Sequence, residues 1–315
     1  MKIILQDNFV GVRGTTTALY DYAYFLKQIY NYECAVTFDE TDLKNDSRVI
    51  EKFKKEFTVL PYKKFDQLDD IISTHGIDML YITKAGNRDG KISNKVKTCV
   101  HAVFPCDRSE KHGDVYAYIS KWLSDFCSNG EYPYIPYMLN LPDVDGNYRA
   151  ALNIPDDAVV FGRYGGIETF DIPFAATAVQ RVLANTTKTY FIFCNTYKFI
   201  DHPRAIFVNS TASLKDKVKF INTCDAFLHA RHRGETFGLA ILEFMSRNKP
   251  VITYSQSEEK NHYSLLGADG LYYQNEDELY SIIMNFSPYN ISYSTLNEFL
   301  PEKVIQKFND VFIKK

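Results

Sequence analysis

Short runs of β-branched and aromatic residues alternate with amphipathic stretches from the start of the chain. Lys2–Gln6 predicts a strand, and Asn8–Thr16 predicts the loop that follows it. Thr17–Tyr30 predicts a helix, because its large apolar residues recur every three or four positions. This alternation is typical of βαβ units around a parallel sheet, so we expect an α/β fold.

The same rhythm fills the rest of the first half of the chain. Further strands are predicted at Glu33–Phe38, Thr58–Leu60, Ile77–Thr83, Thr98–Val103 and Tyr116–Ile119. Ser120–Phe126 predicts a helix that Ser120 caps, since a serine side chain can accept a hydrogen bond from a first-turn amide.

A connection without periodicity separates this half from a second α/β series. Residues 132–146 hold three prolines, which remove ladder donors and fix the backbone. The second series has its strands and helices at Val159–Arg163, Ile172–Ala184, Thr189–Cys194, Ala205–Val208, Leu214–Thr223, Ala226–His229, Phe237–Arg247, Val251–Tyr254, Gly270–Tyr273 and Glu276–Asn285. Ser287–Leu300 is expected to be irregular, and Pro301–Lys315 predicts a final helix.

The length of the chain favours two domains. With 315 residues, the protein exceeds the size of about 250–300 residues at which single cores stop growing. We therefore expect domains at 1–142 and 143–300, a C-terminal helix at 301–315, and a binding cleft between the domains.

Charge and cysteine usage exclude several classes of protein. Thirty-six Lys and Arg against 39 Asp and Glu leave a net charge of −3, which argues against duplex nucleic acid as a partner. None of the six cysteines forms a CxxC pair, so we expect free thiols in a reducing compartment. The short apolar N-terminus and the lack of an 18-residue apolar run predict a cytoplasmic protein.

The segment Cys224–Tyr254 carries the clearest chemistry, because it reads as strand, loop, helix and strand. Thr236 is the candidate N-cap of the helix. The amides near Phe237, Gly238 and Leu239 would then lie at a helix start beyond the sheet edge, where they could hold a phosphate.

Two acids flank this helix start. Glu235 is expected in the loop before the helix, and Glu243 about two turns into it. A carboxylate accepts hydrogen bonds through two oxygens, as a sugar hydroxyl or a ribose diol requires. The alternative is a first-turn acid that complements the helix dipole and a solvated helix position. The apolar residues on both sides of Glu243 weaken that alternative.

Several segments of the second half of the sequence resemble a known family. GETFGLAILEF resembles the E-x7-E signature of retaining GT-B glycosyltransferases, and NKPVITY resembles the following strand in glycosyltransferase family 4. Asn147–Gly166 resembles the segment that opens the nucleotide-sugar domain in that family. The resemblance covers residues 147–285 well and residues 1–130 loosely.

The resemblance implies a fold and a set of domain roles. It implies two Rossmann-like, doubly wound parallel-sheet domains facing across a cleft, with the C-terminal helix crossing back to the N-terminal domain. Residues 1–142 would lie on the acceptor side, and residues 143–300 would bind the nucleotide sugar.

It also implies roles for single residues. Glu235 would contact hydroxyls of the donor sugar, Glu243 the nucleotide ribose, and Arg163 the diphosphate, whose oxygens suit a guanidinium. The alternative for Arg163 is a surface charge at a strand end. The family usually has a Lys five positions after this Arg, but here Glu168 stands there.

The basic loop before Glu235 offers the nearest replacements for that cation, namely Arg231, His232 and Arg233. A solvated basic loop is the competing interpretation.

The N-terminal half offers two weaker matches. Gly14 and Thr15 lie where the family has a Gly-rich loop near the diphosphate, although a plain βα turn is equally compatible. His101 resembles the His that the family places beside the reacting sugar, but a lone His in an apolar strand is often a satisfied core residue. His229 could line the cleft or be the buried end of a strand.

No metal site is predicted. Asp143-Val144-Asp145 resembles a metal-binding DxD, but its place in a proline-rich connection favours a turn. No other His, Cys, Asp or Glu spacing points to a metal.

The resemblance implies a retaining, metal-independent glycosyltransferase that uses no cofactor. The donor would be a nucleotide diphospho-sugar, UDP- or GDP-linked, and the acceptor hydroxyl would belong to a glycan, a lipid or a protein. The alternatives are a GT-B-like protein that binds nucleotide or glycan without turnover, and another GT-B enzyme such as a sugar epimerase or phosphorylase. Membrane association is not predicted, since no basic amphipathic helix is present.

Overall fold

The protein folds into two compact units in the computed structural model, which describes residues 1–314. Met1–Asn140 and residues 298–314 make up the first unit, and Leu141–Asn297 make up the second. No helix among these described residues is long and apolar enough to cross a membrane.

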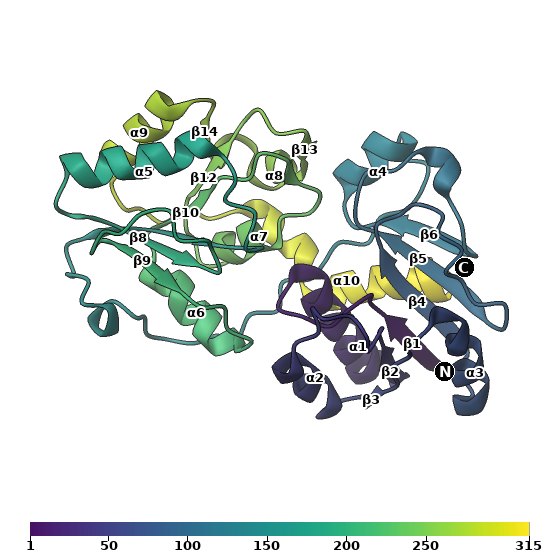
Figure 1. Ribbon diagram of the computed structural model, residues 1–315. Coiled ribbons are helices and arrows are strands. Elements are labelled where there is room, and N and C mark those ends of the chain that lie inside the picture. Colours follow the sequence, from purple (N-terminus) through teal and green to yellow (C-terminus); the bar gives the residue numbers. More distant parts are fainter. Residues whose placement is uncertain (315) are drawn as a thin grey trace. The chain divides into compact units, whose positions relative to one another are not determined.

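A six-stranded parallel sheet forms the centre of the first unit (Figure 1), with strand order β3-β2-β1-β4-β5-β6. Its strands are β1 (Lys2–Gln6), β2 (Glu33–Thr37), β3 (Thr58–Val59), β4 (Met79–Lys84), β5 (Lys97–Ala102) and β6 (Val115–Tyr118). The helices are α1 (Gly14–Tyr30), α2 (Ser47–Lys54), α3 (Leu68–His75) and α4 (Lys121–Ser128). The interior strands are buried on both faces, which explains their continuous apolar runs. Ser120 caps α4, as predicted, by accepting from the Leu123 amide at 3.1 Å.

The C-terminal helix α10 (Pro301–Phe308) packs against α1 of the first unit. The Phe308 ring lies 5.1 Å from the rings of both Tyr22 and Tyr81. A π-helical turn, Asn309–Ile313, continues the helix, and Tyr32 donates to the Asn309 amide oxygen at 3.1 Å. The expected return of the C-terminal helix to the N-terminal domain is confirmed for the described residues; Lys315 lies outside them.

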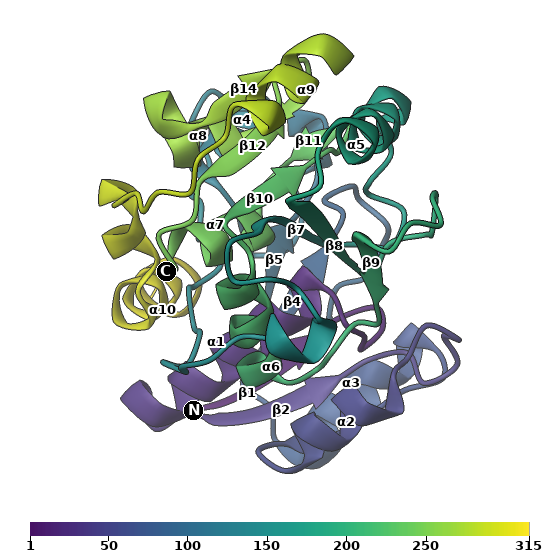
Figure 2. The same ribbon diagram turned by 90° about the vertical axis from the view of Figure 1, so that its left-hand side faces the viewer.

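The second unit has its own six-stranded parallel sheet with the order β14-β12-β10-β7-β8-β9 (Figure 2). The strands are β7 (Val159–Tyr164), β8 (Thr189–Cys194), β9 (Ala205–Val208), β10 (Ala226–His229), β12 (Val251–Tyr254) and β14 (Leu271–Tyr273). The helices are α5 (Pro173–Asn185), α6 (Leu214–Thr223), α7 (Leu239–Met245), α8 (Asn261–Leu266) and α9 (Glu276–Met284). Stacked phenylalanine rings of β7, β8 and β9 fill the core, with Phe193 lying 5.1 Å from Phe207.

A second, two-stranded sheet stands apart from the main one in this unit. It pairs β11 (Gly234–Glu235) with β13 (Glu259–Lys260) in parallel. The sequence pattern did not predict these short strands. Since β10 lies inside the main sheet, between β7 and β12, the chain that leaves β10 reaches β11 at the carboxyl edge of the sheet, where ligands bind in open α/β folds.

Candidate functional site

The loop after β10 returns Glu235 to the sheet edge through a turn that only glycine can make. Gly234 has φ +84°, and a Cβ at this position would lie 2.0 Å from the backbone oxygen of Glu259. The pairing of β11 with β13 then fixes the backbone of Glu235. Glu235 is therefore held by a strand and not by the free loop that the sequence predicted.

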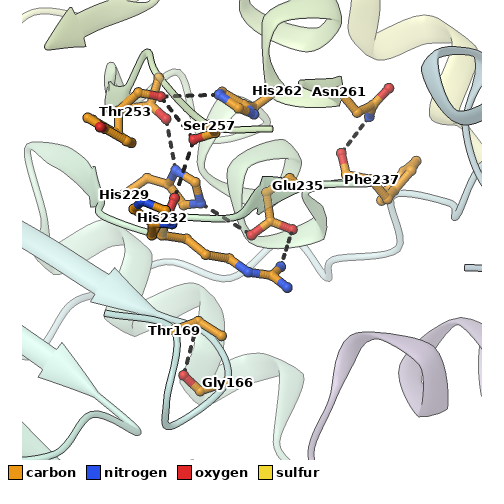
Figure 3. A network of polar contacts seen from close by, with 12 residues as sticks. Gly166, Thr169, His229, His232, Glu235, Phe237, Thr253, Ser257, Asn261 and His262 are labelled. Atoms are coloured by element: carbon orange, nitrogen blue, oxygen red, sulfur yellow. Dashed lines mark hydrogen bonds and ion pairs between the residues drawn. The ribbon is translucent and has the colours of Figure 1, made fainter. Parts of the chain in front are cut away.

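The Glu235 carboxylate sits between two nitrogen donors (Figure 3). His229 Nε2 lies 3.2 Å from one oxygen, and Arg231 donates to the other at 3.0 Å. Burial alone would raise the pKa of Glu235, but the His229 hydrogen bond and the Arg231 charge outweigh it and lower the pKa to about 2. The carboxylate is ionised at neutral pH and can accept further hydrogen bonds.

The His229 ring is fixed from its other side. Its Nδ1 lies 2.8 Å from the Thr253 hydroxyl, and its backbone oxygen accepts from Tyr273 at 3.0 Å. The ring of His262 lies 5.7 Å away. His262 is fully buried, its Nδ1 has no hydrogen-bond partner, and burial lowers its pKa to about 3. His229 is therefore the buried strand end that the sequence allowed, and it also contacts the predicted site.

The helix after Glu235 begins later than predicted. The expected N-cap Thr236 is wrong, because Gly238 is the N-cap of α7 and has φ +92°, which a helical residue cannot adopt. Thr236 and Phe237 are buried before the helix, and the Phe237 carbonyl accepts from Asn261 at 2.6 Å. Leu239 is the first helical residue, so the expected phosphate contact of these amides stays a prediction.

Glu243 is buried and paired. It lies in the second turn of α7, not two turns into the helix, and its side chain is 4% exposed. Lys217 of α6 contacts one carboxylate oxygen at 2.8 Å, and Tyr164 at the end of β7 donates to the other. The solvated helix position that the sequence left open is wrong for Glu243.

Arg163 is buried, so the alternative of a surface charge is wrong as well. Its guanidinium donates to the carbonyls of Asn195 at 2.8 Å and Gly166 at 2.7 Å. It also donates to the Thr196 and Thr169 hydroxyls, both at 2.6 Å. Burial lowers its pKa to about 10, so it remains a cation. Arg163 thus joins the loops after β7 and β8.

The two arginines of the basic loop have different partners. Arg231 pairs with Glu235, whereas Arg233 lies 2.7 Å from Glu259, which the sequence analysis had not singled out. The Glu259 side chain is buried, and its burial raises the pKa of the carboxyl. The competing interpretation of a solvated basic loop is therefore wrong for Arg231, and Arg233 is half-exposed.

His101, in the first unit, is a satisfied core residue. Its Nδ1 lies 2.7 Å from the Tyr81 hydroxyl, and its Nε2 faces the carbonyls of Tyr118 and Ile135 at 3.2 and 3.0 Å. It is fully buried, and burial lowers its pKa to about 4. Both ring nitrogens are engaged, so this geometry supports the core interpretation rather than contact with a sugar.

The glycine-rich segment of the first unit also differs from expectation. Gly14 and Thr15 lie in the first turn of α1 and not in a loop. Just before them, Arg13 pairs with the buried Asp7 at 2.5 Å, and Thr16 donates to the same carboxylate at 3.0 Å. A phosphate contact by Gly14 or Thr15 stays a prediction.

The predicted residues form no metal cluster in the part of the chain that the structure describes. Across residues 1–314, no group of three or more His, Cys, Asp or Glu side chains could hold a metal ion. Two open depressions of about 470 and 420 Å³ lie in the second unit. Both include Asn222 and residues before or at the start of β7, so they contain none of the predicted site residues.

The sequence missed the partners of Glu243 and the hydroxyl that holds His229. Lys217 and Tyr164 are 26 and 79 positions from Glu243, and Thr253 is 24 positions from His229. The partners of Glu235, His229 and Arg231, are within six positions of it, inside the segment already identified as informative.

Comparisons with known proteins agree with the fold and with this segment. Residues 202–278 match the family model "Glycosyl transferases group 1". No curated protein matches the sequence.

Solved structures resemble the whole chain at low sequence identity. HepE of Anabaena, in complex with UDP-glucose, is 14% identical with a TM-score of 0.68, covering 99% of this chain and 95% of that chain. A putative UDP-N-acetylglucosamine 2-epimerase of Listeria monocytogenes is 12% identical with a TM-score of 0.65, covering 100% and 97%. The lipopolysaccharide outer core galactosyltransferase WaaB is 15% identical with a TM-score of 0.63, covering 100% and 99%.

These likenesses confirm the GT-B fold expected from the sequence. The family match spans Lys217, His229, Arg231, Glu235 and Glu243, the residues that form most of the contacts described above. Residues 202–278 therefore carry the pattern of group 1 glycosyl transferases, and they do so within a GT-B fold.

Proposed function

We propose that the protein transfers a sugar from a nucleotide diphospho-sugar to an acceptor hydroxyl with retention of configuration and without a metal ion. One observation carries the proposal. Glu243 of the E-x7-E spacing is buried and Glu235 is partly buried, and each is held by a cation within the segment that matches group 1 glycosyl transferases. Acids are seldom withdrawn from water without a partner, and ionisable groups with displaced pKa values gather at functional sites.

The chemistry assigns a separate task to each acid. Glu235 is ionised and would orient the donor sugar by accepting from its hydroxyls. Glu243 would accept from the ribose diol through the lone pairs that Lys217 and Tyr164 leave open. Positioning the sugar and stabilising charge on the leaving diphosphate would supply the rate enhancement.

The leaving diphosphate needs a positive charge nearby, and the candidate cations differ in how far their side chains are exposed. Arg163 is fully engaged with loop carbonyls and hydroxyls, whereas Arg231 and Lys217 keep about a fifth of their side chains exposed. The family usually has a Lys at the position of Glu168. Arg231 and Lys217 are therefore the better candidates to supply the positive charge that is missing there. The donor is UDP-linked in our proposal, because HepE, a fold relative, binds UDP-glucose.

Calorimetric titration with UDP, GDP, ADP and their sugar conjugates, without metal, tests the donor site. We expect selective binding of one nucleotide, and Glu243→Ala should weaken it roughly 10- to 100-fold because the ribose contact is lost. Glu258→Ala, which removes an exposed acid of the same unit, is the matched control. Failure of all nucleotides to bind would contradict the proposal.

Product analysis then separates transfer from the alternatives. Incubation with the bound nucleotide sugar and a mixture of glycan acceptors should release nucleoside diphosphate and form a glycoside of retained configuration. An epimerised sugar nucleotide would instead support the epimerase alternative, for which the Listeria monocytogenes structure is a fold relative. Binding without consumption of the donor would support a non-catalytic role. The reason to consider that role is that Glu168 stands where the family usually has a Lys.

A further inference from the structure

The Glu235 carboxylate is one end of a chain of hydrogen bonds that crosses the edge of the sheet. The chain runs from the Thr253 hydroxyl to His229 Nδ1 over 2.8 Å, and from His229 Nε2 to Glu235 over 3.2 Å. Figure 3 shows the His229 ring between Thr253 and Glu235. All three residues are on separate strands, β12, β10 and β11.

The chemistry of the two ends determines where the ring proton lies. An ionised carboxylate only accepts hydrogen bonds, so His229 Nε2 must carry a proton. A neutral ring then has a lone pair on Nδ1, which accepts the Thr253 hydroxyl proton. The orientation of the ring is therefore set by a buried hydroxyl on the neighbouring strand of the main sheet.

We propose that His229 is a positioning residue that orients Glu235 toward the donor sugar. This inference rests on the proposed function. Arg231 holds the second oxygen and is partly exposed, whereas His229 is buried at the end of β10 and its backbone oxygen accepts from Tyr273. His229 thus supplies the buried contact to Glu235, and Arg231 keeps exposed surface that an anion can reach.

The burial around the ring supports a positioning role. The ring of His262 lies 5.7 Å from the His229 ring, and both side chains are buried. A side chain held within a small angle of its productive geometry gains more for transfer than one that samples several rotamers.

Two variants of His229 make a matched pair. In His229→Gln the side-chain amide reaches the place of Nε2 and can still donate to Glu235. In His229→Asn the amide reaches only the place of Nδ1 and can bond Thr253 but not Glu235. Both variants keep a polar amide of similar size, so a general loss of packing would affect them alike.

The expected readout is a split between nucleotide and sugar recognition. UDP should bind wild type and both variants with equal affinity, because UDP lacks the sugar that Glu235 contacts. For UDP-glucose, or the sugar nucleotide that wild type prefers, kcat/KM should fall roughly 10- to 100-fold in His229→Asn and recover in His229→Gln. Equal behaviour of Asn and Gln would overturn the inference.

A measurement on the free protein separates this inference from the proposed function. Long-range ¹H–¹⁵N correlation spectra of the protein with ¹⁵N-histidine should show a proton on Nε2 of His229, identified by the signal that His229→Gln loses. A neutral ring with its proton on Nδ1 would overturn the inference even in an active enzyme. Wild type that binds no sugar nucleotide would overturn the proposed function, whatever the tautomer.

Thr253→Val tests the same hydrogen-bond chain if the variants of His229 fail to fold. It removes the hydroxyl while keeping the side-chain shape in β12. The ring then loses its Nδ1 partner, so kcat/KM for the sugar nucleotide should fall while the affinity for UDP stays the same. Thr253→Ser, which keeps the hydroxyl, should behave like wild type. A Thr253→Val enzyme with wild-type kinetics would contradict the role of the hydrogen-bond chain.

Discussion

Glu243 keeps an ionisable group where almost no water reaches it, and its two partners explain how. Lys217 supplies a compensating charge at 2.8 Å, and Tyr164 supplies a hydrogen bond to the second oxygen. Removing one partner of a buried ion pair is costly, because the remaining charge loses its solvation without compensation. The pair therefore couples the stability of α6 and α7 to the geometry of the proposed ribose contact.

Lys217→Met tests this coupling at the scale of one residue. We expect the free energy of unfolding to fall by about 1–3 kcal/mol, below the cost of breaking a fully buried pair because Lys217 is partly exposed. In a Glu243→Gln background the same change should cost much less, since no charge is left unpaired. Urea denaturation of the four proteins of this cycle gives the coupling energy. Equal costs in both backgrounds would show that the pair is not coupled.

At the scale of the element, the two-residue strand β11 decides where Glu235 points. Its formation depends on Gly234, whose positive φ and close approach to the Glu259 carbonyl admit no side chain. Substituting this glycine therefore tests whether the small β11–β13 sheet positions the acid.

Gly234→Ala should destabilise the protein more than the backbone conformation alone explains. Gly146→Ala is the control, because Gly146 has φ +90° with open space around its Cβ position and should cost roughly 1–2 kcal/mol. Gly234→Ala should cost at least about 1–3 kcal/mol more, since the new Cβ meets backbone atoms that must move. Thermal unfolding of the two variants gives the comparison. Similar melting temperatures would mean that β13 shifts easily.

The same elements show what the sequence could predict. The strands Thr189–Cys194, Ala226–His229 and Val251–Tyr254 were predicted to the residue, because continuous apolar runs mark strands buried on both faces. The start of α7 was misplaced because Thr236 has good N-cap chemistry, while the positive φ of Gly238 delays the helix. Local chemistry thus suggested a cap that the backbone did not allow.

The candidate site was predictable only where its residues are close in the sequence. Spacing brought out Glu235 and Glu243, but Tyr164 reaches Glu243 from 79 positions away, through the pairing of β7 with β10. His101 shows the limit of sequence pattern, since one His in an apolar strand fits both a site and a core residue, and the partners of its two ring nitrogens favour the core.

At the scale of the whole molecule, each unit contains a fully buried histidine whose pKa lies well below its ordinary value. His101 lies in the first unit with its pKa lowered by burial to about 4, and His262 lies in the second with its pKa lowered by burial to about 3. Both side chains have an ordinary pKa of about 6.5 in the unfolded chain. Between these values the unfolded state binds protons that the folded state does not.

Acid should therefore destabilise both units as soon as the pH falls below the ordinary pKa of histidine. As pH falls from about 6.5 toward 5, each histidine should lower the free energy of unfolding by up to about 1.4 kcal/mol per pH unit. Above pH 5 the lowered pKa of Glu235, about 2, contributes little to this slope, because that carboxylate is ionised in both states.

The variants His101→Gln and His262→Gln isolate these two contributions. Glutamine does not titrate. The slope of the unfolding free energy against pH should therefore decrease in each variant by up to about 1.4 kcal/mol per pH unit, the contribution of one bound proton. Denaturant unfolding between pH 5 and 7 measures the slopes, and the difference from wild type removes the effect of all other groups. An unchanged slope in His101→Gln would mean that the ring is protonated within the fold, and its contact with the Tyr118 and Ile135 carbonyls would then have to be that of an imidazolium.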